Sequence, residues 1–331
     1  MRISKPSYYD RFRCIAASCP DSCCKEWEVE VDEASAARYR SLTGPLGDRL
    51  RQVLRQEDGV SRMTIEAGRC PMWRQDGLCR IQAELGEEAL CQVCREFPRL
   101  RHDYGDFLEL GLELSCPEAA RLILTATAEA RITGEIPGGE EPEYDTEAMA
   151  VLKATREKAL AILNDGQYDV GQSLALLLLY GYQAQGELDG EEEHPFRPEE
   201  ALASVREFVR QADFSEVTGF FRTLELLTEN WDERLRGDAD APLCPECLAL
   251  GRYLVDRYWL QAVSDYDLYS RVKFTVISCL LVSRLGGDFV QTAQLFSKEI
   301  ENNCDNVEAL LDAAYAHPAF TDDKLLGWLL L

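Results

Sequence analysis

Nine of the chain's 13 cysteines lie in its first 116 residues, and this clustering constrains the fold more than any other feature of the 331-residue sequence. The stretch CPDSCC places Cys19, Cys23 and Cys24 within six residues, and Cys91 and Cys94 form a C-x-x-C pair. A disulfide framework explains this poorly, because the opening MRISKPSYYDRF lacks the apolar core of a secretory signal and cytosolic thiols stay reduced. We therefore expect a cytoplasmic protein whose cysteine region binds metal.

The spacing of the thiols favours an iron–sulfur cluster over zinc. A structural zinc takes four ligands, and nine thiols exceed one such site. Histidine is nearly absent, and His102, the one histidine of this region, is expected at the surface. Thiolate-rich ligation with irregular spacing is typical of iron–sulfur proteins, so we expect iron–sulfur ligation, with zinc as the alternative. The spacing does not determine the number of clusters. Cys116 precedes Pro117 at the start of a predicted helix, whose dipole lowers the pKa of a thiol placed there.

The net charge of −24 is carried by the C-terminal part of the chain. Residues 1–116 hold 17 Lys and Arg against 20 Asp and Glu, whereas the remaining residues hold 18 against 39. Such acidity repels phosphate backbones, which argues against a nucleic-acid partner. It is typical of a solvated surface, or of a platform for a basic partner. The longest apolar runs fall short of the roughly 20 residues that span a bilayer, so no membrane segment is expected.

Hydrophobic periodicity predicts a mainly α protein with two domains. Residues 1–133 are predicted to form a cysteine-rich α+β metal-binding domain with a small sheet, and residues 134–145, rich in Pro, Gly and acid, to form a linker. Residues 146–331 are predicted to form an all-α domain.

In the first domain, period-two alternation predicts strands at 26–32, 62–66 and 107–115, with acidic residues outward, and helices are predicted at 32–42, 46–56, 86–97 and after Pro117. The helices predicted in the second domain are 146–164, 168–185, 199–211, 215–235, 245–262, 265–284, 289–302, 305–316 and 322–330.

Four further cysteines lie in the second domain. Cys279 and Cys304 are expected to be buried apolar residues. Cys244 and Cys247 form a second C-x-x-C, for which a structural role and a redox or metal role both stay open. The chain has no GxGxxG after a strand, no Walker A motif, no HExxH and no GxSxG, which argues against a Rossmann methyltransferase or dehydrogenase.

Three cysteine segments together resemble the flagellin lysine-N-methylase family. They are FRCIAASCPDSCCKEW at 12–27, CPMWRQDGLCRIQAELGEEALCQVCREFPR at 70–99 and SCPEAAR at 115–121, and the cysteine region is similar to the CxxxCC zinc- or iron-chelating domain family. The C-terminal FTVISCLL and LFSKEIENNCDNVEAL also resemble the methylases.

The resemblance implies an S-adenosylmethionine-dependent methyltransferase that acts on flagellin lysines and carries an iron–sulfur cluster, expected to be [4Fe-4S]. The metal ligands it implies are Cys14, Cys19, Cys23, Cys24, Cys70, Cys79, Cys91, Cys94 and Cys116. Arg95 and Arg99 are candidates to contact the cofactor carboxylate, followed by Arg271 and Lys273, with ordinary surface charge as the alternative.

The chemistry requires a neutral lysine amine, although lysine has a pKa of about 10.4, so the site must desolvate the ammonium or supply a base. Spacing identifies no such base. Two other functions stay open: a non-enzymatic iron–sulfur electron-transfer protein, and a zinc-stapled interaction protein. The protein substrate would meet the acidic second domain, and the oligomeric state is not predicted.

Overall fold

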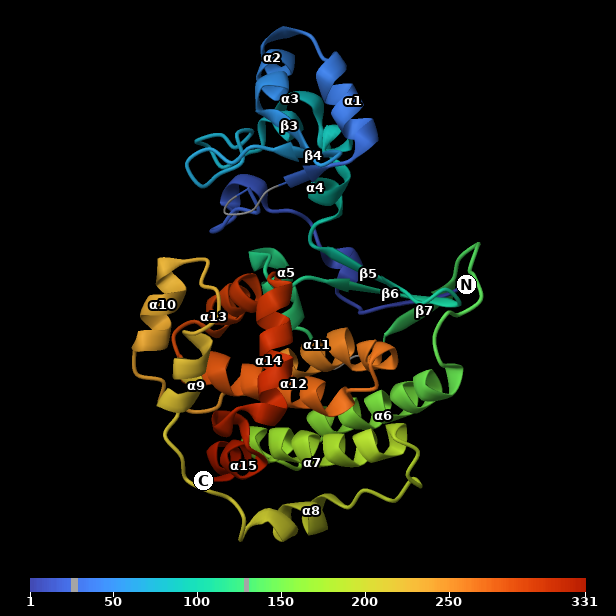
Figure 1. Ribbon diagram of the computed structural model, residues 1–331, viewed down its shortest axis with the longest axis vertical. Helices are drawn as coiled ribbons and strands as arrows, with labels where there is room; N and C mark the ends of the chain where they lie inside the picture. The colour runs from blue at the N-terminus through green and yellow to red at the C-terminus, as the bar shows by residue number, and fades with distance from the viewer. Residues whose placement is uncertain (25–28, 128–130) are drawn as a thin grey trace. The chain divides into compact units, whose positions relative to one another are not determined.

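The computed structural model describes residues 1–24, 29–127 and 131–331, which are mainly helical with small sheets in the N-terminal region (Figure 1). This confirms the predicted fold class. The chain forms two compact units. The cysteine-rich unit comprises residues 12–100 and 116–119, and the helical unit comprises residues 1–11, 101–115 and 120–331. The predicted linker, 134–145, lies within the helical unit, and the predicted domain boundaries stay a prediction.

The cysteine-rich unit builds a three-stranded antiparallel sheet and four short helices. The sheet order is β2-β4-β3, and Val29 of β2 pairs with Met63 of β4. Helix α1 begins after Asp32, whose carboxylate accepts a hydrogen bond from Ser35 N at 2.9 Å. The elements are β2 (Val29–Val31), α1 (Glu33–Ser41), α2 (Gly44–Val53), β3 (Leu54–Glu57), β4 (Val60–Met63), α3 (Arg80–Leu85) and α4 (Gln92–Glu96). Trp27, in the strand predicted at 26–32, lies outside the described residues.

Two predicted helices of this unit are wrong in extent. The helix predicted at 46–56 ends at Val53, because the next residues form strand β3 and pair with β4 across a turn in which Gly59 has φ +83°. The helix predicted at 86–97 is split into a 3₁₀ turn, Glu87–Ala89, and α4. The backbone is extended at Cys91, with ψ 161°, so the helix cannot continue through it.

A four-stranded sheet of order β5-β6-β1-β7 includes the N-terminus of the chain. Strand β1 runs parallel to β6, with Ile3 opposite Leu108, and antiparallel to β7, with Ile3 opposite Gly134. The strand predicted at 107–115 ends at Leu112, and the other three strands were not predicted. Their bounds are β1 (Arg2–Lys5), β5 (Arg99–Asp103), β6 (Phe107–Leu112) and β7 (Ile132–Glu135).

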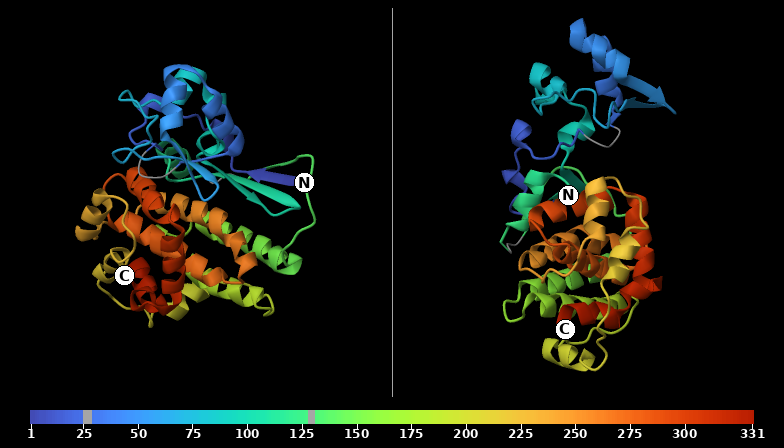
Figure 2. Two further views of the ribbon diagram at one scale, coloured as in Figure 1. Left: turned by 45° about the horizontal axis from the view of Figure 1, so that its top comes forward. Right: turned by 90° about the vertical axis from the view of Figure 1, so that its left-hand side faces the viewer.

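The helical unit packs its helices around α12, which is buried at every position from Leu268 to Ser283. A helix that is buried all round belongs to the centre of a core, and α7, α11 and α14 surround it (Figures 1 and 2). The helices are α5 (Pro117–Leu124), α6 (Thr146–Asn164), α7 (Val170–Leu188), α8 (Pro198–Val205), α9 (Ser215–Phe221), α10 (Glu229–Arg236), α11 (Glu246–Tyr258), α12 (Leu268–Arg284), α13 (Phe289–Phe296), α14 (Cys304–Ala316) and α15 (Asp322–Leu330).

The predicted helix pattern of this unit is largely confirmed, and 146–164 matches α6 residue for residue, but the helix predicted at 199–211 ends at Val205. The helix predicted at 215–235 is wrong, because α9 ends at Phe221 and α10 begins after Thr228, whose side chain accepts from Trp231 N. The helix predicted at 245–262 continues as a 3₁₀ turn from Trp259. The one predicted at 289–302 ends in a π-helical turn, Ser297–Glu301.

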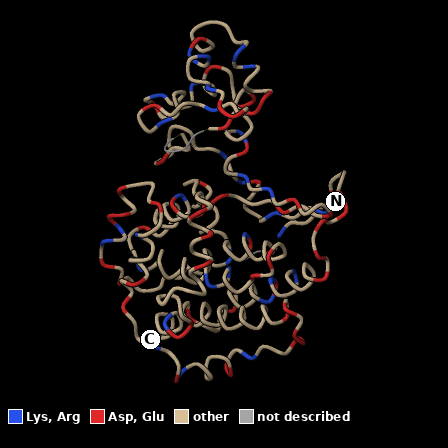
Figure 3. Tube along the Cα trace, in the orientation of Figure 1, with Lys and Arg blue, Asp and Glu red and all other residues tan. Residues whose placement is uncertain are grey.

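Acidic side chains are spread along the helices and loops of the helical unit (Figure 3). Cys279 is fully buried, as predicted, but the prediction for Cys304 is wrong, because this residue is exposed at the first position of α14. His102 is half-buried, and its Nε2 has no hydrogen-bond partner among the described residues. No helix in the described ranges has the length and apolarity needed to cross a membrane.

Candidate metal centre and ligand cavity

Two cysteines of the cysteine-rich unit stand at the first turn of a helix. Cys79 and Cys91 lie immediately before α3 and α4, where the first amides of a helix have no partner within it. Neither side chain caps its helix with a hydrogen bond. Burial raises the pKa of Cys79, and the nearby amides of Ile81 and Gln82 act in the opposite direction.

Two further thiols have raised pKa values. The hydrogen bond with Cys24 and burial raise the pKa of Cys70. Burial raises the pKa of Cys116 to about 11, although the amides of Glu118 and Ala119 at the start of α5 act in the opposite direction. Backbone donors of this kind stabilise negative charge on sulfur and tune iron–sulfur clusters. The sequence predicted the place of Cys116 at a helix start, but the predicted lowering of its pKa is wrong, because burial outweighs the effect of the helix amides.

The thiols also pair with one another. The side chain of Cys24 shares hydrogen bonds with those of Cys23 and Cys70, and these bonds lower the pKa of Cys24 to about 3. The two segments are joined by the backbone as well, because Cys70 N donates to Cys24 O at 2.8 Å. In the C-x-x-C pair, a hydrogen bond from Cys94 lowers the pKa of Cys91 to about 7. The same hydrogen bonds raise the pKa of the partner thiols Cys23, Cys70 and Cys94, so one thiol of each group is favoured as the thiolate, the form that binds metal.

All nine predicted ligands share one neighbourhood within this unit. Cys24 interacts electrostatically with Cys79 and Cys94, and Cys79 interacts with Cys91. At the other side of the group, Cys14 and Cys116 act on Cys23, and Cys19 acts on Cys116. The fold therefore collects thiols from residues 14–24, 70–94 and 116, segments far apart along the chain.

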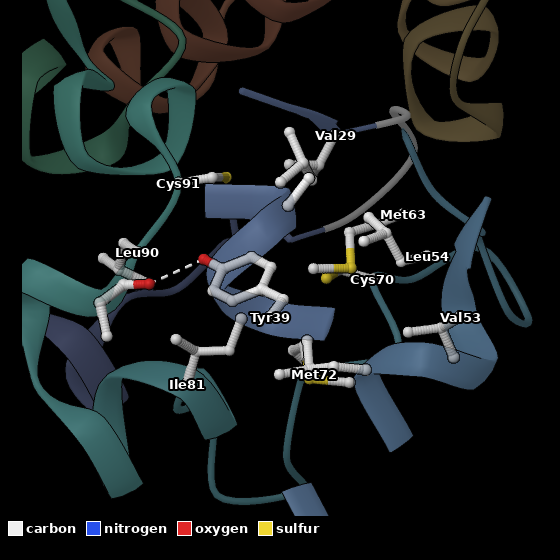
Figure 4. Packing of buried hydrophobic residues seen from close by; sticks show 14 of the residues in the cluster. Val29, Tyr39, Val53, Leu54, Met63, Cys70, Met72, Ile81, Leu90 and Cys91 are labelled. Carbon is white, nitrogen blue, oxygen red and sulfur yellow. Dashed lines mark hydrogen bonds between the residues drawn. The ribbon is translucent and has the colours of Figure 1, made fainter. Parts of the chain in front are cut away.

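The apolar core of the unit fixes the position of two of these thiols. Cys70 and Cys91 are 7% and 2% exposed and pack with Tyr39, Met72 and Ile81 (Figure 4). The Tyr39 hydroxyl donates to Ala89 O at 2.7 Å, which holds the segment that leads into Cys91. A low-polarity wall of this kind limits solvent access to a bound cluster.

The donor set fits a thiolate-bound cluster in its chemistry. It consists of thiols from three segments, with the pKa lowered for Cys24 and Cys91 and raised for Cys23, Cys70, Cys79, Cys94 and Cys116. Across residues 1–24, 29–127 and 131–331, no group of three or more His, Cys, Asp or Glu side chains has the arrangement that holds a single metal ion. The assignment of the nine cysteines as ligands therefore stays a prediction.

The arginines that flank these cysteines mostly have partners. Arg69 lies over the Trp73 ring, with its Cζ 3.9 Å from the centroid, and Arg80 pairs with Glu84 at 2.7 Å. Arg95 is exposed on α4, and Arg99 is half-buried, with its Cζ 5.3 Å from the centroid of the Phe12 ring.

The other two predicted cofactor contacts, Arg271 and Lys273, belong to the helical unit, and the structure does not place them in the same unit as Arg95 and Arg99. Both lie buried on α12. Arg271 pairs with Asp265 at 2.8 Å, and Lys273 pairs with Asp322 at 3.0 Å. These ion pairs give both cations a structural role, and their contact with a cofactor stays a prediction.

The helical unit contains a cavity of about 900 Å³ that the sequence did not predict. Strands β1, β6 and β7 and helices α5, α6 and α11 contribute to its wall. The volume falls within the range of sites for small molecules and cofactors. Its apolar wall includes Ile3, Phe107, Leu108, Ile123 and Leu160, and its charged groups include Glu109, Arg131, Lys153, Arg156, Arg252 and Asp256.

Several charged groups of the cavity retain unused hydrogen-bonding capacity. Arg131 pairs with Asp256 at 3.3 Å, but Oδ1 of Asp256 is buried and has no partner among the described residues. The same holds for Nε of Arg156, a residue that is 5% exposed. Burial lowers the pKa of Arg252 and of Lys153, and the Lys153 Nζ lies 3.5 Å from the centroid of the Phe107 ring. Unpaired buried polar atoms are costly, so a polar ligand in the cavity would relieve this cost.

One signal for this cavity was present in the sequence. Arg252 and Asp256 are four residues apart, so they share a face of α11, which is otherwise rich in apolar residues. Glu109 is likewise an acid within a leucine-rich strand, and the prediction that it points outward is wrong: it is 7% exposed and paired with Arg156.

Three curated proteins are similar to this chain, each about 30% identical to it over 129 residues. The chain is 31% identical over 129 residues to a lysine-N-methylase of Salmonella typhimurium, and the match covers 37% of this chain and 32% of that protein. It is 30% identical over 129 residues to the flagellar biosynthetic protein FliU of Salmonella muenchen, with coverage of 37% of this chain and 76% of the relative. A lysine-N-methylase of Salmonella choleraesuis is 30% identical over the same length.

The match thus spans 32% of the length of the two lysine-N-methylases. No family model and no solved structure matches the chain. The chain is 30% identical to FliU and covers 76% of it. On this evidence the chain belongs to the flagellin lysine-N-methylase family.

Proposed function

We propose that this chain is a cytoplasmic S-adenosylmethionine-dependent protein-lysine N-methyltransferase that carries an iron–sulfur cluster and acts on flagellin. The relatives are named lysine-N-methylases and a flagellar biosynthetic protein, which supports a protein substrate with a reactive lysine. The observation that supports the cluster is that nine thiols from three segments belong to the cysteine-rich unit, with the pKa of Cys24 and Cys91 lowered.

The cluster would be held by thiolates chosen from the nine cysteines, with Cys24 and Cys91 as the first candidates because their pKa values are lowered. The low-polarity wall formed by Tyr39 and Met72 would restrict water at this site. A bound cluster would supply redox chemistry or an open iron position, or would stabilise the unit.

The cavity of the helical unit is the proposed site of S-adenosylmethionine. This ligand has a carboxylate, an ammonium, a sulfonium and ribose hydroxyls, and it supplies an electrophilic methyl group when bound. Arg252 and Lys153 would meet the carboxylate, since both are cationic, half-buried and part of the wall. Asp256 Oδ1 would accept from an ammonium or hydroxyl, because it lacks a partner among the described residues.

The acceptor lysine must reach the methyl group in its neutral form. A half-buried wall with apolar groups such as Phe107 and Ile123 favours the neutral amine over the ammonium. The acidic surface of the chain beyond residue 116, with 39 acidic against 18 basic residues, would attract a lysine-bearing protein before that step.

The experiment is calorimetric titration of S-adenosylmethionine into anaerobically purified protein, followed by mass spectrometry of flagellin incubated with both. Arg252→Ala removes a charge-assisted contact, so its Kd should rise roughly tenfold to hundredfold. Arg197→Ala is the matched control, since Arg197 is an exposed arginine of the same unit outside the cavity wall. Iron and zinc are measured in the same preparation.

Each failure points to a different part of the proposal. Equal affinities of the two variants would remove the cavity as the cofactor site. Tight binding with an unmodified flagellin would remove flagellin as the acceptor. A colourless preparation with zinc in place of iron would remove the iron–sulfur cluster.

A further inference from the structure

A second pair of cysteines lies in the helical unit, where the C-x-x-C of residues 244–247 leads into helix α11. The sulfur atoms of Cys244 and Cys247 are 3.9 Å apart, and Cys247 N donates to Cys244 O at 3.0 Å. A turn closed by such a bond keeps its end Cα atoms within about 7 Å, a separation that a disulfide can bridge. The two thiols therefore need only side-chain rotation to bond.

The two sulfurs differ in access to solvent. Cys244 is half-buried, and the neighbouring Pro245 and Glu246 are exposed, so reagents can approach this residue. Cys247 is fully buried against α12, where its thiol lies 3.8 Å from Cys279 O. In a reactive dithiol, the accessible sulfur attacks and the buried sulfur resolves the intermediate.

The surroundings of Cys244 favour its thiolate. A hydrogen bond from the Cys247 thiol lowers the pKa of Cys244 to about 7, and the Ser283 hydroxyl, 3.7 Å from the Cys244 sulfur, acts in the same direction. Ser283 is held in place by Cys244 N, which donates to its Oγ at 3.2 Å, and by the carbonyl of Pro242 at 3.0 Å. A thiol whose pKa lies near ambient pH is the best nucleophile for exchange.

We propose that Cys244 and Cys247 form a thiol–disulfide exchange site that takes low-molecular-weight disulfides, with Cys244 as the attacking and Cys247 as the resolving thiol. The Cys244 thiolate attacks one sulfur of the disulfide, whose S–S bond breaks to release the first thiolate. Cys247 then attacks the Cys244 sulfur, forms the Cys244–Cys247 bond and releases the second thiolate. The two protons of the dithiol go to the released thiolates, so the protein is oxidised and the small disulfide is reduced by two electrons.

This site is separate from the proposed metal centre and does not rest on the methyltransferase proposal. All nine candidate ligands belong to the cysteine-rich unit, whereas Cys244 and Cys247 belong to the helical unit. The nearest third thiol, Cys279, is turned toward a carbonyl, with its sulfur 3.5 Å from Cys247 O.

Tryptic peptide mapping after exposure to bis(2-hydroxyethyl) disulfide tests the proposal on the full-length protein. This probe is uncharged, so Glu246 does not repel it. Cleavage after Arg236 and Arg252 releases residues 237–252, which contain Cys244 and Cys247 and no other cysteine. The expected product is this peptide lighter by two hydrogen atoms, restored by dithiothreitol.

The chain contains its own control for exposure. Cleavage after Lys298 and Lys324 releases residues 299–324, whose one cysteine, Cys304, is exposed on α14. If reactivity followed exposure alone, Cys304 would take up the probe faster than the half-buried Cys244. We expect the internal disulfide of 237–252 to form before any adduct accumulates on Cys304.

Two variants assign the roles of the thiols. Cys247→Ser should trap the mixed disulfide on Cys244, and Cys244→Ser should leave Cys247 unmodified because it is buried.

Ser283→Ala should raise the pH midpoint of the reaction of Cys244 by roughly half to one pH unit, the effect of one lost hydrogen bond. A peptide 237–252 that stays reduced while Cys304 reacts, or a Cys247→Ser variant without an adduct on Cys244, would overturn the proposal.

Discussion

Arg156 of α6 donates to both carboxylate oxygens of Glu109 of β6, at 2.8 and 2.7 Å, although the two residues are 47 positions apart. The side chains are 6% and 9% exposed. Removing one residue leaves the other charge buried without its partner. Arg156→Met or Glu109→Leu alone should therefore lower the free energy of unfolding by about 3–5 kcal/mol. The double variant should lie close to the wild type, because replacing both charges leaves none unpaired. Urea unfolding of all four proteins checks this, and a double variant as unstable as the worse single variant would contradict it.

The same ion pair predicts an acid-sensitive contribution to stability. Burial alone would raise the pKa of Glu109, but the hydrogen bonds and charge of Arg156 lower it below the usual value. A carboxyl group with a lowered folded-state pKa stabilises the fold above its unfolded-state pKa of about 4.3 and loses that contribution as pH falls through the folded-state pKa. The stability of the wild type relative to the Glu109→Leu/Arg156→Met variant should be constant from pH 7 to about pH 5. Below about pH 5 the wild type should lose stability relative to the variant. A difference that is flat down to pH 2.5 would show that Glu109 does not carry this effect.

Replacing single cysteines distinguishes the proposed ligands from the other thiols. Cys24→Ser and Cys91→Ser should retain roughly half or less of the iron of the wild type and lose visible absorbance, because a hydroxyl is a much weaker ligand than a thiolate. Cys304→Ser is the control, since this cysteine is exposed and lies in the helical unit. Iron analysis and absorption spectra of anaerobic preparations provide the measurement, and equal iron in all three variants would exclude Cys24 and Cys91 as ligands.

Two glycines in helices predict opposite effects of the same substitution. A Cβ on Gly181 of α7 would lie 2.5 Å from Val272 Cγ1 on the buried helix α12, so Gly181→Ala should cost about 1–3 kcal/mol. A Cβ on Gly219 of α9 meets nothing within 4 Å among the described residues, so Gly219→Ala should be neutral or stabilise by up to about 1 kcal/mol. Thermal unfolding of both variants is the test. A Gly181→Ala protein as stable as Gly219→Ala would mean that α7 and α12 pack less closely.

Pocket residues give a further prediction for ligand-induced stability. S-adenosylmethionine at 100 times its Kd should stabilise the wild type by about 2.7 kcal/mol and the Asp256→Asn variant by less, because the amide cannot pair with an ammonium as a carboxylate does. The comparison uses thermal shifts with and without ligand, and S-adenosylhomocysteine serves as the control that lacks the transferable methyl group. Identical shifts in wild type and variant would remove Asp256 from the proposed site.

The sequence by itself determined the local structure where one residue pattern dominates. The helical period of residues 146–164 predicted α6 to the residue, and Cys116-Pro117 placed the start of α5. It also singled out the nine clustered thiols from Cys14 to Cys116, whose role as metal ligands stays a prediction. It also placed Cys279 in the core, because most residues around it, in FTVISCLLV, are apolar.

Only the tertiary structure decided which distant groups meet. The strands β1 and β7 are short, and their pairing is visible only once β6 lies beside β1. Glu109 alternates with leucines as a solvent-facing residue would, yet Arg156 from another element covers it. The cavity is likewise formed by segments that are distant in the sequence. The assignment of Arg95 and Arg271 to different units also depends on tertiary contacts. Periodicity reports what a residue does within its own helix or strand, whereas burial of charge and the shape of a cavity depend on the packing of segments that the sequence keeps far apart.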